Sequence, residues 1–268
     1  MIDLRSISFR YREDWVLQDI SFRIERSEFI GVIGPNGSGK STLLKTLCRL
    51  LVPQKGEILL DNVSLKEMGQ REIAKKMAVV PQEAYSLFPF RVTEIVLMGR
   101  SPYLGHLMFE RAMDLEIAKK AMEWTEILQI SERSIDELSG GERKRVFIAK
   151  ALAQEPEIIL LDEPTANLDI HHQVDFLSLI LSLNREKGLT IVMASHDLNI
   201  ASEYCDRLIL LKEGKIYKIG SPREVITREN IEEVYGCEVW VDENPISGMP
   251  RITLLKEGNC INETLERD

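Results

Sequence analysis

The sequence has few cysteines and no long hydrophobic run. Its four cysteines are Cys48, Cys205, Cys237 and Cys260, which lie far apart and form no Cys-x-x-Cys pair. This argues against a disulfide scaffold or a zinc cluster and favours a reducing compartment. No stretch of about 18 apolar residues is present, so we expect no membrane-spanning helix. The first residues lack the apolar core of a signal peptide, and we expect none.

The sequence also has fewer basic than acidic residues. The 268 residues include 34 Lys and Arg against 43 Asp and Glu, a net charge of −9. Such a chain repels phosphates on average, so we predict that it does not bind nucleic acid, although a local site can still bind a phosphorylated ligand. With 16 Gly, 10 Pro and 44% hydrophobic residues, the composition is that of a globular protein. The length predicts one large domain or two coupled domains.

The most informative motif occupies residues 34–41 and matches GxxxxGK[ST] in full. It follows an apolar run and precedes leucines at helical spacing, which is the strand–loop–helix context of a phosphate-binding loop. Its glycines let backbone N–H groups point at phosphate oxygens, and the helix presents its positive end to the same anion. We predict that Lys40 reaches the β- and γ-phosphates and that Ser41 ligates Mg²⁺. The predicted phosphate-binding residues are Gly34, Pro35, Asn36, Gly37, Ser38, Gly39, Lys40, Ser41 and Thr42.

A second apolar strand, over residues 158–161, ends in two carboxylates. Ligands of open α/β folds bind at the carboxyl ends of the parallel strands. We therefore predict that Asp162 ligates Mg²⁺ and that Glu163 positions and polarises an attacking water. Lys40 and Asp162 are too far apart in the sequence for one simple crossover, and the residues between them have a helical pattern. There an apolar stripe at spacings of three and four predicts a core-facing helix, with Ala112, Leu115, Ala118, Ala121 and Met122 buried.

These patterns predict an α/β fold. It has a phosphate-loop core, with a mainly parallel sheet and helices on both faces, plus an N-terminal antiparallel β region and an inserted α-helical subdomain. The antiparallel region rests on the alternation of apolar and polar residues at 20–25 and on a similar pattern at 2–9, whose slip suggests a bulge. We divide the chain into residues 1–82 with 154–220 (the nucleotide-binding core), 83–153 (the helical subdomain) and 221–268 (a short C-terminal extension).

Near the end of the helical region stands Leu138-Ser139-Gly140-Gly141-Glu142. Taken alone, it also matches a helix that begins with Ser139 as its N-cap. Together with the phosphate loop, it resembles the signature of the ATP-binding cassette (ABC) ATPases, and the resemblance extends over about residues 1–220 with the motifs in family order. It implies that the nucleotide is ATP.

The resemblance also implies roles for single residues. Gln82 looks like the family's Q-loop glutamine, which would bridge Mg²⁺ and the attacking water. Asp169 looks like part of the D-loop, and His196 like the switch histidine that senses the γ-phosphate. Tyr11 looks like the aromatic residue that stacks on adenine. The alternative is that these residues are structural: Gln82 an amide at a strand end, His196 a structural histidine, and Tyr11 an aromatic residue of the core or surface. The expected catalytic residues are therefore Glu163, Gln82 and His196.

Family members pair head to tail and enclose two ATP molecules. This chain carries one copy of each motif, so the resemblance implies a homodimer in which Ser139, Gly140 and Gly141 of one chain cap the ATP held by the other.

Residues 96–103, residues 168–173 and the short tail resemble the ATPase subunits of importers for iron chelates (siderophore or haem) and cobalamin. This implies a separate multi-span permease, indirectly a substrate-binding protein, and a peripheral location at the cytoplasmic face of the cell membrane. A groove between Gln82 and about Gly105 would receive the permease. Phe88, Phe90 and Tyr103 are candidate contacts, or they pack within the helical region.

One departure from the family is Lys144, where Gln or Arg is commoner. Two alternative functions stay open. A soluble ABC ATPase with a non-transport partner usually has two cassettes in one chain or a long coiled-coil insertion, and neither is present. A nucleotide-binding regulatory module that does not hydrolyse ATP is the other, and the presence of both Glu163 and His196 argues against it.

Overall fold

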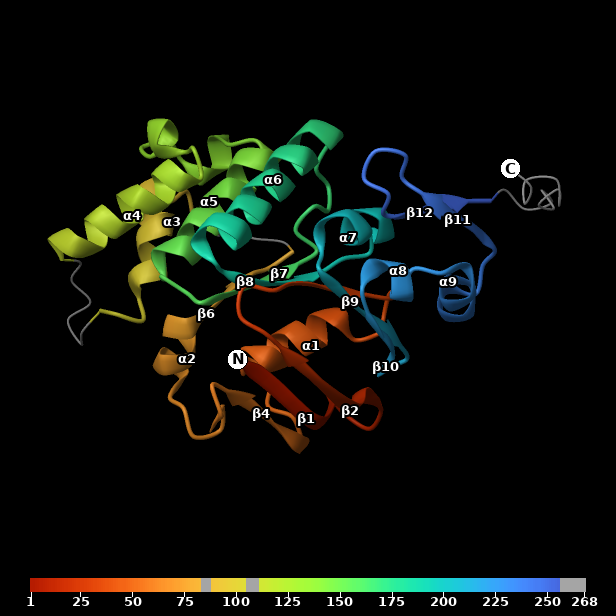
Figure 1. The fold of residues 1–268 in the computed structure, drawn as a ribbon. Coiled ribbons are helices and arrows are strands. Elements are labelled where there is room, and N and C mark those ends of the chain that lie inside the picture. The colour runs from red at the N-terminus through yellow and green to blue at the C-terminus, as the bar shows by residue number, and fades with distance from the viewer. Residues whose placement is uncertain (83–87, 105–110, 256–268) are drawn as a thin grey trace.

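The structure, a computed structural model, describes residues 1–82, 88–104 and 111–255 of the 268-residue chain. Its centre is a six-stranded sheet with the strand order β10-β9-β3-β8-β7-β6 (Figure 1). All its strands run parallel except β10, which pairs antiparallel with β9 at one edge. The mainly parallel sheet that the sequence predicts is confirmed. The strands are β3 (Phe29–Ile33), β6 (Met77–Val80), β7 (Ile158–Asp162), β8 (Thr190–Ala194), β9 (Arg207–Lys212) and β10 (Lys215–Gly220).

Side chains along the central strands point alternately into two hydrophobic cores. Phe29 and Ile159 belong to the core on one face of the sheet, and Ile30 and Leu160 belong to the core on the other. All four are fully buried. Because both faces are covered, these strands are apolar at nearly every residue, as is typical of parallel sheets.

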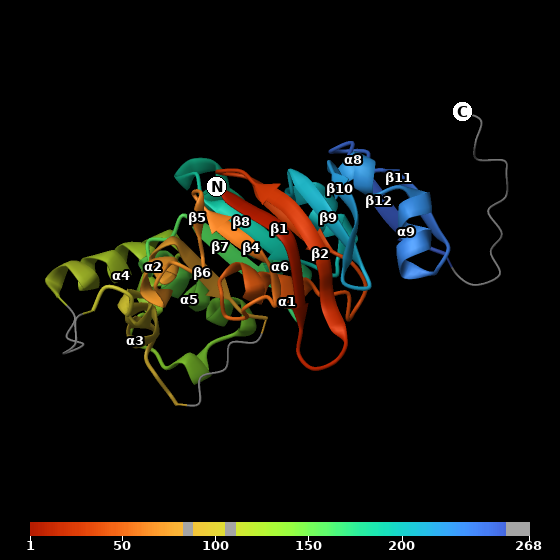
Figure 2. The same ribbon diagram turned by 90° about the horizontal axis from the view of Figure 1, so that it is seen from below.

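The N-terminal antiparallel region is a separate four-stranded sheet with the order β2-β1-β4-β5. Figure 2 shows β1, β2 and β4 side by side across the central sheet. The expected bulge in β1 is confirmed, since its pairing with β2 shifts between Leu4 and Ile7 and Ser6 has a φ of 49°. Helix α1 packs against β2 on one side and against β7 and β8 on the other. The elements are β1 (Ile2–Arg10), β2 (Trp15–Ile24), α1 (Lys40–Leu47), β4 (Lys55–Leu60), β5 (Val63–Ser64) and α2 (Gln70–Lys76).

The other face of the central sheet is covered by helices (Figure 1). In the described part of the chain between β6 and β7, every named element is helical. These elements are α3 (Val92–Leu97), α4 (Ala112–Trp124), α5 (Gly140–Ala153) and the 3-10 helices Met98–Arg100, Leu128–Ile130 and Ile135–Glu137. Helices α6 (Ile170–Lys187) and α7 (Leu198–Tyr204) complete this layer.

One part of the apolar stripe predicted along α4 is wrong. Ala118, Ala121 and Met122 are buried as expected, but Ala112 is exposed and Leu115 is 50% exposed. The neighbouring Asp114 is buried instead, because the buried guanidinium of Arg100 pairs with its carboxylate at 2.9 Å. A buried ion pair therefore sets the orientation of the first turn of α4.

The C-terminal elements extend the core at the β9–β10 end of the molecule (Figure 2). Val225, Ile231 and Ile252 are buried in the core on the helical face. The elements are α8 (Pro222–Val225), α9 (Arg228–Tyr235), β11 (Val239–Glu243) and β12 (Pro250–Leu254). Cys260, together with the rest of the extension beyond residue 255, and Gly105, the expected end of the docking groove, lie outside the described residues.

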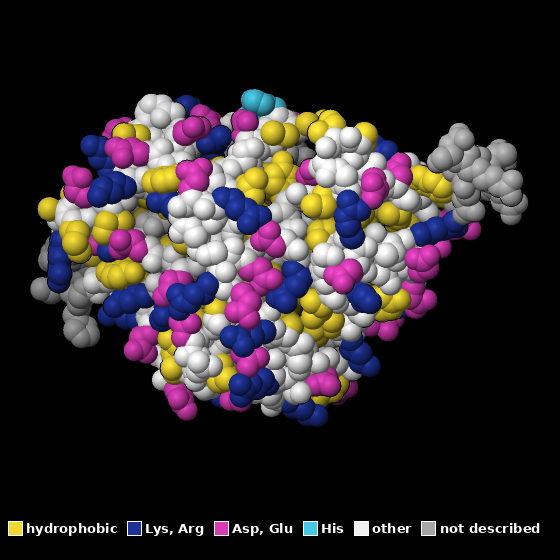
Figure 3. All heavy atoms as spheres, viewed as in Figure 1, with side chains coloured by type: hydrophobic (Ala, Val, Ile, Leu, Met, Phe, Trp, Pro, Cys, Tyr) yellow, Lys and Arg dark blue, Asp and Glu magenta, His cyan; other side chains and the backbone are white. Residues whose placement is uncertain are grey.

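Charges of both signs are mixed on the face drawn in Figure 3, where Lys and Arg side chains alternate with Asp and Glu. Within residues 1–82, 88–104 and 111–255, no helix has the length and apolar character that crossing a bilayer requires.

Candidate functional site

The loop between β3 and α1 has a backbone that requires glycine. Gly34, Gly37 and Gly39 have φ values of 148°, 79° and 104°, a region that side chains disfavour. A Cβ on Gly34 would lie 2.4 Å from the carbonyl oxygen of Leu211, so a larger residue would push the loop away from β9. A Cβ on Gly37 would meet nothing within 4 Å, and the loop is therefore open to a ligand on that side.

Lys40 places its ammonium group inside this loop. The Nζ atom donates hydrogen bonds to the carbonyl oxygens of Gly34 at 2.8 Å and Pro35 at 3.0 Å. Burial lowers the pKa of Lys40, and the two carboxylates after β7 raise it by a smaller amount. The buried hydroxyl of Ser38 has no hydrogen-bond partner in the described part of the chain. A cation and an unsatisfied hydroxyl in one glycine-rich loop fit an anion with many oxygens, such as a triphosphate.

Ser41 and Asp162 meet between α1 and the end of β7. The Ser41 hydroxyl donates to Oδ1 of Asp162 at 2.7 Å. Burial raises the pKa of Asp162, the bond from Ser41 lowers it, and the neighbouring Glu163 raises it again. This oxygen pair fits Mg²⁺, which binds one or two carboxylates together with phosphate oxygens and water. The described residues contain no group of three or more His, Cys, Asp or Glu that could hold a metal ion by itself.

Glu163 lies between the two other residues expected to be catalytic. Gln82 donates from Nε2 to Oε2 of Glu163 at 2.8 Å, and Nδ1 of His196 lies 3.5 Å from the same oxygen. Glu163 has a φ of 46°, and its N–H donates to the carbonyl oxygen of Ala194 at 3.0 Å. The turn that carries the carboxylate is thus fixed to β8. The structure brings these three side chains together from the ends of β6, β7 and β8.

Tyr11 lies beside the first turn of α1. Its hydroxyl is 3.5 Å from Oγ1 of Thr42, and its ring packs edge-on against Phe9 with the centroids 4.9 Å apart. The residue is 60% exposed. An exposed ring next to the phosphate loop suits stacking on a base, while the contact with Phe9 is the ordinary packing that the sequence also allowed.

Ser139 begins helix α5 as its N-cap, as the sequence allowed. The hydroxyl of Ser139 accepts from the N–H of Glu142 at 3.2 Å, and Oε2 of Glu142 accepts from the Ser139 N–H at 2.8 Å and hydroxyl at 2.7 Å. These reciprocal bonds form a capping box. The hydrogen bonds from Ser139 lower the pKa of Glu142.

The two signature glycines face α6. A Cβ on Gly141 would lie 2.9 Å from the ring of His172, and one on Gly140 would lie 4.0 Å from Leu168. Asp169 caps α6 by accepting the His172 N–H at 2.9 Å. Between the described side chains, no hydrogen bond or ion pair joins residues 139–141 or Asp169 to the phosphate loop. The structure therefore brings the signature and the D-loop together.

Two of the three candidate permease contacts pack within the helical region. The Tyr103 hydroxyl donates to the carbonyl oxygen of Gln154 at 3.0 Å, and its ring centroid lies 4.0 Å from the Arg100 guanidinium. Phe90 packs against the core on the helical face. Phe88 is 64% exposed, and its ring lies edge-on to that of Phe90 with the centroids 6.0 Å apart. For Tyr103 and Phe90, the packing alternative therefore describes the structure.

The sequence predicts no role for two residues, Asp197 and Lys144, whose hydrogen bonds hold backbone segments of the site in place. Asp197 caps α7 by accepting the Ile200 N–H at 3.0 Å, which fixes the chain directly after His196. An Asp just before an apolar helix is an N-cap signal that could have revealed it. Lys144 donates to two carbonyl oxygens of the loop after Glu163, a long-range contact with no local sequence signal.

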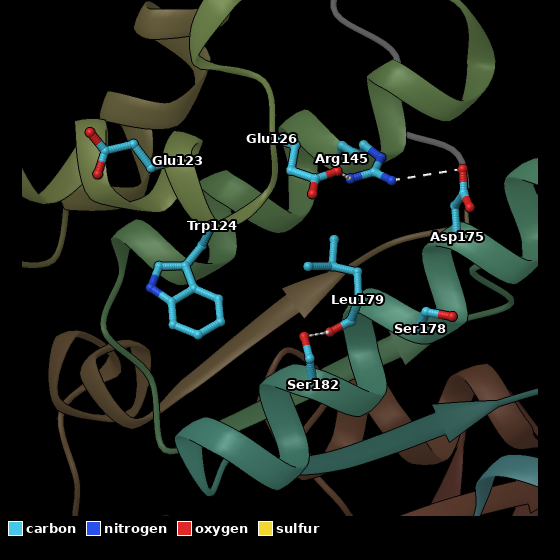
Figure 4. A pocket seen from close by; sticks show the side chains of 8 residues that line it. All are labelled: Glu123, Trp124, Glu126, Arg145, Asp175, Ser178, Leu179 and Ser182. Carbon is cyan, nitrogen blue, oxygen red and sulfur yellow. Dashed lines mark hydrogen bonds and ion pairs between the residues drawn. The ribbon is translucent and has the colours of Figure 1, made fainter.

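A hollow of about 620 Å³ lies apart from these residues, between the end of α4 and the middle of α6. In Figure 4, Arg145 spans it, with ion pairs to Glu126 at 3.0 Å and Asp175 at 3.9 Å, and the indole of Trp124 lies at its side. No phosphate-loop residue lines this hollow, and we assign it no part in nucleotide chemistry.

The loop between β3 and α1, with the carboxylates after β7, places the chain among the phosphate-loop nucleotide hydrolases. Within that class, the sequence model of the ABC transporter family matches residues 17–166. The chain belongs to this family and is an ATP-binding ATPase.

Two relatives are matched over almost the whole chain. The ferric enterobactin transport ATP-binding protein FepC of Escherichia coli (strain K12) is 41% identical over 93% of this chain and 92% of that protein. The cobalamin import ATP-binding protein BtuD of Halobacterium salinarum (strain ATCC 29341 / DSM 671 / R1) is 35% identical over 96% of this chain and 64% of that protein.

Two solved structures share the fold. One, described as a metal-chelate type ABC transporter in an inward-facing conformation, has a TM-score of 0.84 and 28% identity over 95% of this chain and 97% of the other. The other is the dimeric ATP-binding cassette MJ0796 bound to ADP and Pi, with a TM-score of 0.71 and 30% identity over 82% of this chain and 98% of the other.

Proposed function

We propose that this chain is the ATP-hydrolysing subunit of an importer that takes up an iron chelate (siderophore or haem) or cobalamin through a separate permease. The observation that carries hydrolysis is the position of Glu163, which accepts a hydrogen bond from Gln82 and faces His196. The substrate class rests on the names of the relatives, which concern ferric enterobactin and cobalamin.

In this proposal, Glu163 orients and polarises the attacking water. Gln82 already donates its amide N–H to Glu163, which leaves the amide oxygen free to accept from the water or to approach the metal ion. His196 would donate a hydrogen bond to the γ-phosphate. A positioned general base contributes about 10²–10⁴ to the rate.

Mg²⁺, when bound, supplies the positive charge that neutralises the triphosphate. Ser41 and Asp162 would hold it, because their oxygens already meet, and the amide oxygen of Gln82 would be a further ligand. Lys40 and the loop N–H groups would bind the phosphates, and the ring of Tyr11 would stack on the adenine.

We further propose a head-to-tail homodimer with ATP at the interface. Its support is the signature, which begins α5, packs beside α6 and the D-loop, and makes no hydrogen bond or ion pair with its own chain's phosphate loop among the described residues. Ser139, Gly140 and Gly141 would contact the ATP bound by the partner, with Asp169 beside them. The relative solved with ADP and Pi is dimeric.

The permease would dock on the helical subdomain, residues 83–153, and this contact would hold the chain at the cytoplasmic face of the cell membrane. A substrate-binding protein would deliver the cargo to the permease from the other side. Phe88 is the exposed aromatic residue of the three candidate contacts.

The experiment is to identify a permease and a substrate-binding protein among the coding sequences beside its gene and to co-express them with the chain. Uptake of a labelled ferric siderophore, haem and cobalamin is measured together with ATPase turnover. We expect uptake of one of these with the native chain and loss of uptake with Glu163→Gln, whose turnover falls by about 10²–10⁴. Glu186→Gln, a change at an exposed carboxylate of α6, is the matched control.

The two alternative functions give different results in the same assay. Hydrolysis by the native chain without uptake of any of these substrates would indicate a non-transport partner. Binding of ATP without hydrolysis would indicate a regulatory module.

A further inference from the structure

Lys144 joins the signature helix to the loop that follows Glu163. It lies in the second turn of α5, and its Nζ donates to the carbonyl oxygens of Pro164 and, at 2.9 Å, Ala166. These are backbone acceptors of one short loop, so a single side chain from α5 holds that loop at two points.

The ammonium group of Lys144 makes no ion pair within the described residues, although the side chain is half-buried. Burial alone lowers the pKa of Lys144 to about 8. A buried cation is costly unless its donors are satisfied. The two carbonyl oxygens satisfy two of the three donors. Lys144 itself lines a hollow of about 240 Å³, together with Gln82, Arg143 and Asn167.

The loop held by Lys144 continues directly from the reactive carboxylate. The Ala166 N–H donates back to the carbonyl oxygen of Glu163 at 3.2 Å, and the Leu168 N–H donates to that of Thr165 at 3.3 Å. These consecutive turns connect Glu163 to the D-loop. Glu163 has a left-handed backbone, a conformation that persists only when its surroundings fix it.

We propose that Lys144 is a positioning residue, which sets Glu163 relative to the signature helix through the carbonyls of Pro164 and Ala166. It does not touch the nucleotide. The inference rests on the proposed function, because it assigns Lys144 to the hydrolysis that Glu163 performs. In the proposed dimer, α5 contacts the partner's ATP while Glu163 serves the chain's own ATP, so Lys144 connects the two sites mechanically.

The test compares kcat and KM of four chains: native, Lys144→Met, Lys144→Arg and Lys150→Met. Methionine keeps the apolar stem but donates nothing, and arginine keeps the charge and the donors. Lys150 is the matched control, because it is on the same helix and burial lowers its pKa too, but it makes no hydrogen bond to this loop. We expect kcat of Lys144→Met to fall about 10-fold or more, with KM for ATP within about two-fold. Lys144→Arg, which keeps the donors, and Lys150→Met should stay near native.

A second measurement separates positioning through Glu163 from a general loss of folding. In a chain that already carries Glu163→Gln, Lys144→Met should reduce turnover by less than about two-fold, because the group it positions is gone. Lys144→Leu also donates nothing and should lose kcat as Lys144→Met does, so it provides the comparison if the Met variant does not fold.

Native kcat in Lys144→Met or Lys144→Leu would overturn the proposal, as would an equal loss in Lys150→Met or a full further loss in the Glu163→Gln chain. These outcomes leave the proposed function intact. Failure of the native chain to hydrolyse ATP would overturn the proposed function instead.

Discussion

The buried guanidinium of Arg100 should be one of the most costly side chains to remove. Arg100 is 1% exposed and Asp114 is 3% exposed. The guanidinium pairs with Asp114 at 2.9 Å and Glu155 at 2.7 Å, donates to the carbonyl oxygen of Ala153 at 2.7 Å, and lies over the ring of Tyr103. It therefore joins the 3-10 helix after α3, the start of α4 and the end of α5.

Arg100→Leu removes the cation but keeps an apolar side chain in its place. Among the described residues, the carboxylate of Asp114 then stays buried with the Arg111 N–H, at 3.0 Å, as its one remaining hydrogen-bond donor. Breaking a buried pair in this way costs about 3–5 kcal/mol, a large share of the roughly 5–15 kcal/mol that stabilises a typical protein. Urea titration followed by circular dichroism measures the loss of unfolding free energy.

Two further variants test the cause of this loss. Arg91→Leu breaks an exposed ion pair with Glu132 and should cost less than about 1 kcal/mol. Adding Asp114→Asn to Arg100→Leu neutralises the stranded carboxyl and should recover part of the loss, since the amide oxygen can still accept from Arg111. A cost for Arg100→Leu no larger than that for Arg91→Leu would refute the reasoning.

Three other outcomes follow from the structure. Gly39→Ala should abolish ATP binding by calorimetry, because a Cβ there would lie 2.8 Å from Leu17 and 2.9 Å from the carbonyl oxygen of Val16 at a φ of 104°; native affinity would contradict this. Tyr11→Ala should weaken ATP binding by about 1–3 kcal/mol and Tyr11→Phe should not; equal affinities would leave the ring a packing role only. Burial lowers the pKa of Lys144 from 10.5 to about 8, so the unfolded chain binds more protons between these values and the cost of burying the cation disappears as the pH rises. Relative to Lys144→Met, the unfolding free energy of the native chain should therefore increase by up to about 3 kcal/mol between pH 7 and pH 10, and a constant or falling difference in urea titrations would exclude a buried ammonium.

The sequence predicts the structure best where the ligand-binding residues and the residues that shape the backbone lie in one short segment. The phosphate loop combines three glycines, a lysine and a hydroxyl between a strand and a helix, and the structure has that arrangement at residues 34–41. The positions of the central strands are equally well predicted, because strands buried on both faces are apolar along their whole length.

The sequence predicts least where a contact joins distant residues. The stripe on α4 placed Leu115 inward because helical spacing alone cannot show that Arg100 will bury Asp114 beside it. Lys144 appears in the sequence as a charged residue on a basic helix, and only the folded chain places it on the carbonyls of Pro164 and Ala166. Position along the chain gives no signal for either contact.

The sharing of each ATP between two chains is tested most directly with mixed dimers of Lys40→Ala and Ser139→Arg. The first variant loses its phosphate loop, and the second places a bulky cation at the start of α5. If each site is built within one chain, both sites of the mixed dimer carry a lesion. If each site is shared, both lesions fall in one site and the other pairs an intact loop with an intact signature. Nucleotide trapped with vanadate in isolated mixed dimers should therefore reach about half the native level, and no trapping above the level of either variant alone would contradict the shared site.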